Sequence, residues 1–177
     1  TGEDAVHLVP LHTAHGQQIP PDQAPAHVLT SAAGESVPED ATRHIDLPPG
    51  TRVALMEDSL DGRWLAVSTY LGVLILIDIE TGDQHQIQDS PYGSITDLAF
   101  STDSQWLAWA EPVGADEARS RIMMVRTTDP DTGPVEVTDG RFRDHSPSFT
   151  PDGKFLAFLS ERSFDPVYDT QGFDLSF

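Results

Sequence analysis

The chain has 177 residues, no cysteine, and 29 acidic against 10 basic side chains, which gives a formal net charge of −19. The lack of cysteine excludes disulfide scaffolds, cysteine nucleophiles and thiolate metal sites, and the negative charge argues against nucleic acid as a partner. The longest apolar run, residues 71–77, is far shorter than the roughly 20 residues of a membrane helix, and no leader segment marks the chain for secretion.

Proline is concentrated in the first part of the chain, where aromatic residues are absent. Residues 1–50 hold 7 of the 14 prolines, and the first aromatic residue is Trp64. Because aromatic side chains supply much of a core's buried area, the packed part should begin near residue 50. We expect two strands before it, at residues 5–11 and 41–47, joined by an exposed Pro-rich loop that could include a short strand at residues 26–30.

Three segments of the chain repeat one another without gaps: SLDGRWLAV (59–67), STDSQWLAW (101–109) and TPDGKFLAF (150–158). Each contains a hydroxyl residue, a spacer, Asp, then Gly or Ser, a polar residue, an aromatic residue, Leu-Ala and an apolar residue. The structural repeat positions are the aspartate and the aromatic residue of each segment, namely Asp61, Trp64, Asp103, Trp106, Asp152 and Phe155. Repetition at spacings of 42 and 49 residues indicates an array of similar units.

Each of the first two repeats also has a second half with two further expected strands. In the first unit these are residues 73–79 and 85–88, separated by a Thr-Gly turn. In the second they are residues 121–126 and 135–138, and the insertion 111–120 explains most of the extra length. The Asp-Gly and Thr-Gly pairs suit tight turns that need positive φ.

Four antiparallel strands in about 40–45 residues are typical of a β-propeller blade. The fold class is therefore all-β, and the pattern predicts two whole blades with a half blade at each end. Residues 1–42 would form a blade-edge strand and the Pro-rich loop, and residues 43–177 the propeller blades. Because a propeller needs at least four blades to close, we expect a piece of a longer chain; a compact four-bladed ring is the structural alternative.

The aromatic residue of each repeat should occupy an equivalent buried position on the second strand of its blade. The first repeat departs from the other two at one point, since Asp58 stands where they have Phe100 and Phe149. This difference predicts a frayed or specialised first strand in that blade.

The third repeat resembles a known family. Its sequence HSPSFTPDGKFLAFLS (145–160) is similar to the blade motif of TolB-like propellers, in which Ser-Pro precedes an aromatic residue and Asp-Gly-Lys. The stretches at residues 138–153 and 159–177 more narrowly resemble tricorn proteases, in the part that follows a blade of their second, seven-bladed propeller. The resemblance covers roughly residues 43–177.

The resemblance implies a role for the chain. Tricorn proteases are large cytoplasmic serine peptidases that trim oligopeptides and assemble as hexamers, and their seven-bladed propeller is thought to filter peptides on the way to the active site. The implied partners are therefore the remaining blades, the PDZ-like and catalytic domains, and peptide substrates, with neither nucleic acid nor membrane. The family's catalytic motifs match no position here, so we assign no catalytic, cofactor-binding or metal-binding residue.

One stretch, Asp144-His145-Ser146, superficially offers the acid, base and nucleophile of a serine hydrolase. Triad members come from separate elements in the hydrolases that define the pattern, and Ser146 precedes a proline at the start of an expected inner strand. We therefore interpret these residues as a turn hydrogen bond at the entry to that strand.

Other candidate groups have simpler interpretations. The spacing of His12 and His15 would suit a metal on a helix, but they lie in a polar loop. The acidic pairs, which we expect to be solvated, are Glu57-Asp58 and Asp116-Glu117.

Three functions are compatible with this sequence. The first is a non-catalytic propeller module of a tricorn-type peptidase. The second is a propeller over a prolyl-oligopeptidase-type active site, which requires an α/β-hydrolase domain with a G-x-S-x-G elbow. The third is a free-standing TolB-like binding scaffold. The family resemblance favours the first.

Overall fold

A computed structural model describes residues 5–8, 43–115 and 118–162, and almost every regular element among them is a β-strand. The chain divides into two compact units, Thr1–Arg52 and Val53–Phe177, which we describe separately. The expected strand at residues 26–30 and most of the Pro-rich loop lie outside the described residues. The described residues contain no helix with the length and apolar character needed to cross a membrane.

The first unit contains one two-stranded antiparallel sheet. Strand β1 (Ala5–Leu8) pairs with β2 (Arg43–Asp46), with Ala5 opposite Asp46. Ile45 and Leu47 are buried, whereas the residues between and before them are exposed. This alternation is typical of a half-buried strand. The strands expected at both places are confirmed within the described residues.

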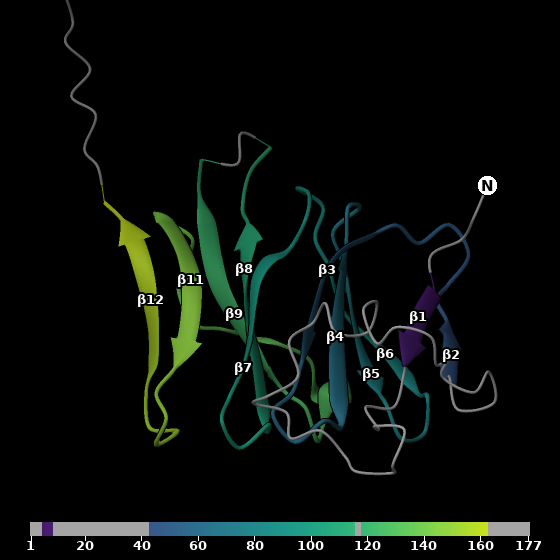
Figure 1. The fold of residues 1–177 in the computed structure, drawn as a ribbon. Helices are drawn as coiled ribbons and strands as arrows, with labels where there is room; N and C mark the ends of the chain where they lie inside the picture. Colours follow the sequence, from purple (N-terminus) through teal and green to yellow (C-terminus); the bar gives the residue numbers. More distant parts are fainter. Residues whose placement is uncertain (1–4, 9–42, 116–117, 163–177) are drawn as a thin grey trace, which may run out of the picture. The chain divides into compact units, whose positions relative to one another are not determined.

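The second unit begins with a complete blade. Strands β3 (Val53–Asp58), β4 (Trp64–Thr69), β5 (Val73–Asp78) and β6 (Gln84–Asp89) form an antiparallel sheet in chain order (Figure 1). All six residues of β4 are buried, as expected for a strand covered on both faces. The first strand is not frayed, because β3 extends to Asp58, which pairs with Leu65, although its last four residues are exposed.

The second blade consists of β7 (Thr96–Phe100), β8 (Trp106–Pro112), β9 (Ser120–Arg126) and β10 (Val135–Glu136), with the 3-10 turn η4 (Pro130–Thr132) before β10. The expected fourth strand at 135–138 thus has only two residues in ladder geometry. The expected insertion 111–120 partly belongs to strands, since β8 and β9 extend into it from both ends.

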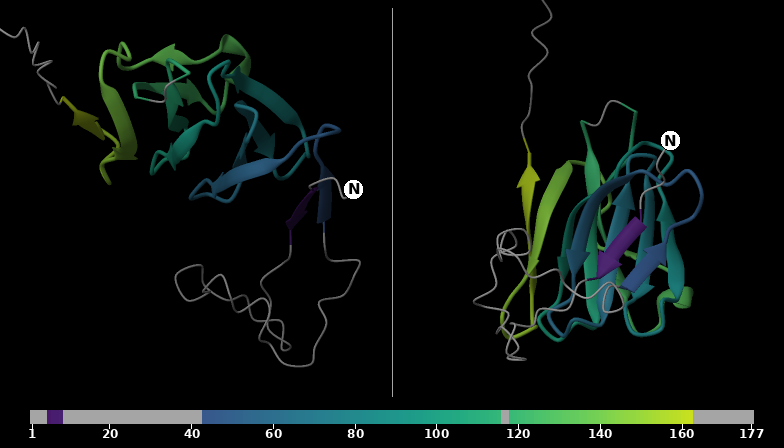
Figure 2. Two further views of the ribbon diagram at one scale, coloured as in Figure 1. Left: turned by 90° about the horizontal axis from the view of Figure 1, so that it is seen from above. Right: turned by 45° about the vertical axis from the view of Figure 1, so that its right-hand side comes forward.

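The half blade consists of β11 (Arg143–Phe149) and β12 (Leu156–Glu161), which pair antiparallel. A single parallel bridge between Arg143 and Ser120 joins β11 to β9, so that β7–β12 form one six-stranded sheet. Seen from above, this sheet stands beside the first blade (Figure 2, left). The all-β class and the partial propeller are confirmed.

Apolar side chains of the first two blades form one core. Its buried members, drawn from both sheets, are Trp64, Ala66, Leu74, Leu76, Ile87, Ile95, Leu107, Trp109, Met123 and Val125. Because these residues come from facing blades, neither sheet could bury its apolar face alone.

The prediction that the three repeat aromatic residues are equally buried is wrong. Trp64 is 5% exposed and Trp106 is partly buried, but Phe155 is 67% exposed and lies just before β12. Within the described residues the half blade has only two strands and no further blade against its outer face, so the position that is covered in the first repeat is open in the third.

A buried ion pair within the second blade is linked to the first blade by a hydrogen bond. Glu111 of β8 is 1% exposed. Its Oε1 accepts a hydrogen bond of 2.8 Å from Nε2 of Gln88 in β6, and its Oε2 lies 3.3 and 3.2 Å from Nε and Nη2 of Arg121 in β9. Nη1 of Arg121 also donates to Glu136 at 2.8 Å.

The first strands of neighbouring repeats lie side by side, β3 next to β7 and β7 next to β11. Each of these strands contains a bulge in its pairing with the strand that follows. In two bulges a non-glycine residue has a left-handed backbone, Asp97 with φ 54° and Ser146 with φ 53°. Both residues stand six positions before the repeat aspartate, so they are equivalent, and each bulge interrupts the ladder near a polar side chain.

Candidate functional site

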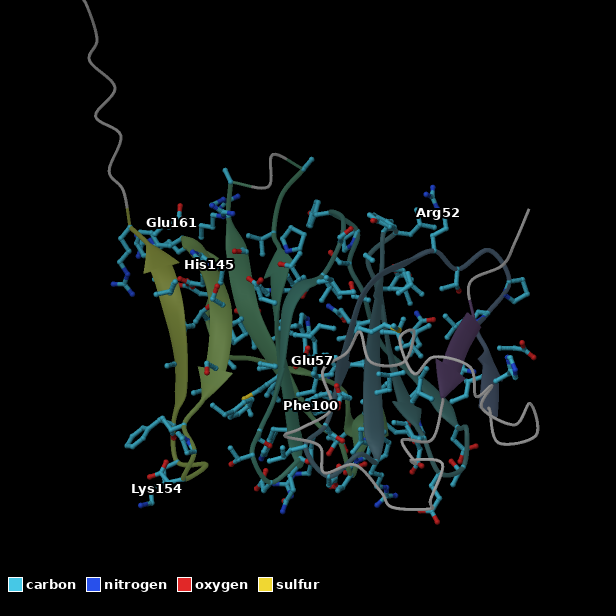
Figure 3. All side chains as sticks on the ribbon, in the orientation of Figure 1. Arg52, Glu57, Phe100, His145, Lys154 and Glu161 are labelled. Carbon is cyan, nitrogen blue, oxygen red and sulfur yellow. The ribbon has the colours of Figure 1, made fainter. Side chains whose placement is uncertain are left out.

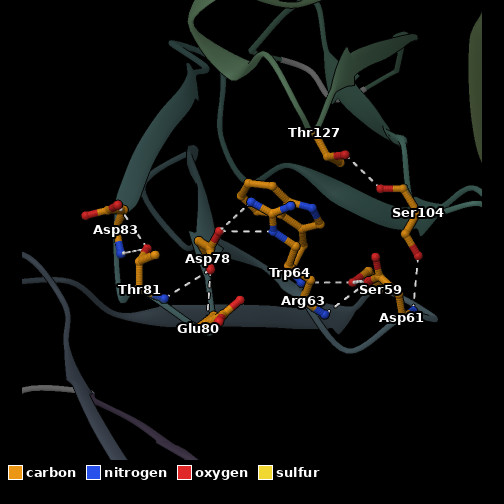
Figure 4. A network of polar contacts seen from close by, with 10 residues as sticks. All are labelled: Ser59, Asp61, Arg63, Trp64, Asp78, Glu80, Thr81, Asp83, Ser104 and Thr127. Atoms are coloured by element: carbon orange, nitrogen blue, oxygen red, sulfur yellow. Dashed lines mark hydrogen bonds and ion pairs between the residues drawn. The ribbon is translucent and has the colours of Figure 1, made fainter.

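The aspartate of the first repeat organises a closed turn (Figure 4). Oδ1 of Asp61 accepts hydrogen bonds from the hydroxyl of Ser59 at 2.6 Å and the amide of Arg63 at 3.0 Å. The Ser59 hydroxyl accepts from the amide of Trp64 at 2.9 Å. Gly62 has φ 72°, and its amide donates to the Ser59 carbonyl, which closes the turn.

The second and third turns repeat the same hydrogen bonds. In each, the hydroxyl side chain donates to the aspartate and accepts from the amide of the aromatic residue. These roles belong to Ser101, Asp103 and Trp106 in the second turn and to Thr150, Asp152 and Phe155 in the third. The next positions, Ser104 and Gly153, have φ 58° and 68°, so the predicted left-handed turn is confirmed.

Hydrogen bonding lowers the pKa of all three aspartates. For Asp103 and Asp152 the largest cause is the hydroxyl of the preceding serine or threonine, followed by a backbone amide. Burial acts to raise the pKa of Asp61, but hydrogen bonds from Ser59 and nearby groups outweigh it and the pKa is lowered. The ionised carboxylate is therefore the form that fits each turn.

Adjacent turns are also linked to one another. The amide of Asp61 donates to the hydroxyl of Ser104 at 3.1 Å, and the hydroxyl of Thr102 donates to the carbonyl of Pro151 at 3.3 Å. Thr127 donates to the Ser104 carbonyl at 2.7 Å. The first two bonds connect each repeat to the next at one end of the strands, and the third holds Ser104 within its own repeat. The six repeat residues thus build and join turns, and their contacts form no catalytic grouping.

The Asp144-His145-Ser146 stretch has a different geometry from a turn at a strand entry. Ser146 lies inside β11, and its hydroxyl is 2.9 Å from Nδ1 of His145, while its amide donates to Oδ2 of Asp97 at 3.0 Å. Asp144 is buried, and its Oδ1 has no hydrogen-bond partner among the described residues. The acid beside the imidazole is instead Glu161, with Oε1 3.3 Å from Nε2 of His145.

Glu161 was missed by the sequence reasoning, because its contact with His145 depends on the register of two strands. Strands β11 and β12 pair antiparallel, with Arg143 opposite Glu161 and His145 opposite Leu159. The register therefore brings the carboxylate to the end of β11, where Figure 3 shows His145 and Glu161 close together. The same Oε1 atom of Glu161 also lies 3.1 Å from Nη1 of Arg143.

A cavity of about 490 Å³ lies between the second blade and the half blade, beside Arg143 and His145. Its lining includes Asp97 from β7, Arg119 from the segment before β9, and Arg143, His145 and Ser146 from β11. The cavity lies at the strand ends opposite the repeat turns and is lined largely by polar and cationic side chains. It is a candidate binding site for an anionic or polar group.

The remaining candidates are two acidic pairs and two histidines. Within the described ranges no three His, Asp or Glu side chains are grouped closely enough to hold a metal ion. Glu57 and Asp58 are exposed, as expected, and burial followed by the charge of Asp58 raises the pKa of Glu57. The other two candidate groups lie outside the described residues, namely His12 with His15 and the pair Asp116-Glu117.

Comparison with known proteins gave three informative similarities, although no family model matches the sequence. The chain is 44% identical over 126 residues to tricorn protease homolog 1 of Streptomyces coelicolor, a match that covers 71% of this chain and 11% of that protein. The crystal structure of the tricorn protease superposes with a TM-score of 0.62 at 26% identity over 73% of this chain and 13% of the other. A prolyl endopeptidase structure gives a TM-score of 0.52 at 16% identity over 71% of this chain and 22% of the other, which shows a common fold alone. The chain thus spans about a tenth of the curated relative's length.

Proposed function

This chain is a segment of a tricorn-type β-propeller, and from that premise we propose that it is a non-catalytic propeller segment of a serine-type peptidase that degrades oligopeptides. In this proposal the complete propeller admits or filters peptide substrates before they reach an active site in another domain. The observation that carries the proposal is the match at 44% identity over 126 residues of this chain.

The site geometry supports a non-catalytic role. The Ser146 hydroxyl contacts the imidazole of the adjacent residue, but an acyl-transfer site also needs amides directed at the developing oxyanion. The amide of Ser146 is already bonded to Asp97. His145 and Glu161 therefore stand beside a serine whose own backbone cannot supply that stabilisation.

The proposal extends to partners and location. The blade faces would be completed by the remaining blades of the parent chain, followed by PDZ-like and catalytic domains. The assembly would be a cytoplasmic homo-oligomer, a hexamer by the family resemblance, that acts on peptides and binds neither nucleic acid nor membrane.

The reading frame of the parent gene after Phe177 tests the proposal. We expect a PDZ-like domain followed by a serine peptidase domain. An α/β-hydrolase domain with a G-x-S-x-G elbow would instead support the prolyl-oligopeptidase alternative, and an open reading frame with neither would support a free-standing TolB-like scaffold.

Activity of the purified 177-residue chain is a second test. We expect no hydrolysis of a fluorogenic peptide after stringent purification. Turnover that co-purifies with the chain and disappears in Ser146→Ala would contradict the non-catalytic assignment.

A test of the filtering role requires the parent peptidase. It should cleave an unstructured peptide but spare the same sequence when folded domains flank it on both sides. Equal cleavage of both substrates by the intact parent would argue against filtering.

A further inference from the structure

We infer that the cavity between the second blade and the half blade binds a carboxylate group of a peptide through Arg119, Arg143 and His145, and that Glu161 competes with the ligand for Arg143 and His145. The inference deepens the proposed function, because it rests on peptides being the molecules that pass this propeller. Its experiment measures binding to this one cavity and is independent of the catalytic domains.

Cations are concentrated at this end of the strands in a chain of strongly negative charge. The whole sequence has 10 Lys and Arg residues and a net charge of −19. Five of the ten stand at the start of β9, the start of β11 or the end of β12: Arg119, Arg121, Arg141, Arg143 and Arg162. The register places these three strand ends together, since Arg143 is opposite both Ser120 and Glu161. Three carboxylates at the same strand ends pair with Arg121 and Arg143, namely Glu111, Glu136 and Glu161, so an anionic ligand would be recognised by individual groups and not by a uniform positive field.

Two residues that line the cavity, Arg143 and His145, already hold a carboxylate, that of Glu161, which is not part of the lining. A single oxygen of Glu161, Oε1, lies 3.1 Å from Nη1 of Arg143 and 3.3 Å from Nε2 of His145. A guanidinium and an imidazole that converge on one oxygen form a charge-assisted carboxylate clamp. Glu161 therefore acts as an internal stand-in for the ligand's carboxylate.

The position of Glu161 allows a ligand to compete with it for its two partners. The side chain is 52% exposed and belongs to β12, which forms the edge of its sheet among the described residues. An exposed ion pair contributes little net free energy, so an external carboxylate competes on nearly equal terms. Arg119 provides an additional donor, because it is exposed and lines the same cavity.

The polar groups on the opposite wall define which ligands fit. The carboxylate of Asp97 is engaged by the amide of Ser146 at 3.0 Å, so it is fixed in place and repels an anion from that side. The ligand's carboxylate is thereby directed toward Arg143 and His145. A cavity of about 490 Å³ has room for a side chain and part of the adjoining backbone, which fits a peptide segment.

The test uses the 177-residue chain and three peptides in chemical-shift titrations. The first is acetyl-Ala-Glu-Glu-Ala-amide, the second replaces both Glu by Gln, and the third is the Gln peptide with a free C-terminal carboxylate. We expect at least one carboxylate peptide to bind and the fully neutral peptide not to bind. Preference for the first or the third then identifies a side-chain or a C-terminal carboxylate as the ligand.

Two substitutions with opposite effects distinguish the clamp from general electrostatics. Glu161→Gln should tighten binding about two- to fivefold, because it removes the internal competitor. Arg143→Gln should weaken binding by a similar factor. The matched controls, Glu80→Gln and Lys154→Gln, change the net charge by the same amount and lie at the opposite strand ends, where Figure 3 shows Lys154.

A gain of affinity cannot result from misfolding, so Glu161→Gln keeps the test decisive even if Arg143→Gln destabilises the chain. The inference is overturned if Glu161→Gln tightens binding no more than Glu80→Gln does. Equal binding of all three peptides, or no binding of any, would also overturn it. Neither result would affect the reading-frame test of the proposed function.

Discussion

Replacing Arg121 by methionine should destabilise the chain more than replacing its partner Glu111 by glutamine. The two residues form one ion pair, but Glu111 is 1% exposed whereas the Arg121 side chain is 29% exposed. In Arg121→Met the buried carboxylate keeps only the hydrogen bond from Gln88. In Glu111→Gln the guanidinium keeps Glu136 at 2.8 Å and partial contact with water.

The magnitudes follow from this asymmetry. Leaving a buried charge without its partner costs about 3–5 kcal/mol, which is the loss expected for Arg121→Met. Glu111→Gln loses a charge-assisted hydrogen bond but leaves no buried charge, so we expect a loss of about 1–2 kcal/mol. The double variant should be more stable than Arg121→Met alone, because the second substitution removes the unpaired carboxylate.

Urea denaturation monitored by tryptophan fluorescence measures all three losses, provided that the slopes of the transitions agree. Arg126→Met is the matched control on the same strand, since its guanidinium is stacked on Trp106 at 4.8 Å and its side chain is exposed; it should cost about 1 kcal/mol or less. The reasoning is refuted if Glu111→Gln costs as much as Arg121→Met, or if the double variant shows no recovery relative to Arg121→Met.

Three further predictions concern the turns and the core. Because the folded pKa of Asp61 lies below the ordinary value of about 3.9, its contribution to stability is present above that pH and is lost as the pH falls through the folded pKa. Asp61→Asn should therefore flatten the acid side of a stability profile measured by denaturation at several pH values. An unchanged acid slope would contradict this prediction. Gly72→Ala should lower the free energy of unfolding by about 1–3 kcal/mol more than Gly82→Ala. Both glycines have positive φ, but of the two only Gly72 has backbone carbonyl oxygens, those of Ser90 and Gly93, where a Cβ would collide with them. Equal shifts of the melting temperature would contradict this prediction. Trp109→Ala should lower the free energy of unfolding by about 3–5 kcal/mol and Phe155→Ala by less than about 1 kcal/mol, because the first side chain is fully buried and the second is 67% exposed. Similar losses for both variants in chemical denaturation would show that Phe155 is buried in solution.

The sequence by itself determined the repeats, the turns and most strands, because the interactions that form them are local. In the first turn the hydroxyl of Ser59 and the amide of Arg63 reach Asp61 from only two residues away on either side. The same spacing recurs in the other two turns, so the pattern of residue types is sufficient to predict the geometry. The apolar strands that follow each turn are likewise recognisable from composition alone.

Only the tertiary structure decided which of these equivalent positions are buried and which polar groups meet. Phe155 matches Trp64 in the repeat but is exposed, because burial depends on the blade that stacks against a strand and not on the strand's own sequence. Glu161 reaches His145 and Arg143 through the register of β11 and β12, and the buried carboxylate of Glu111 is satisfied across two blades. Such contacts join residues far apart in the sequence, so no local pattern specifies them; they arise when the strands pair and the sheets pack.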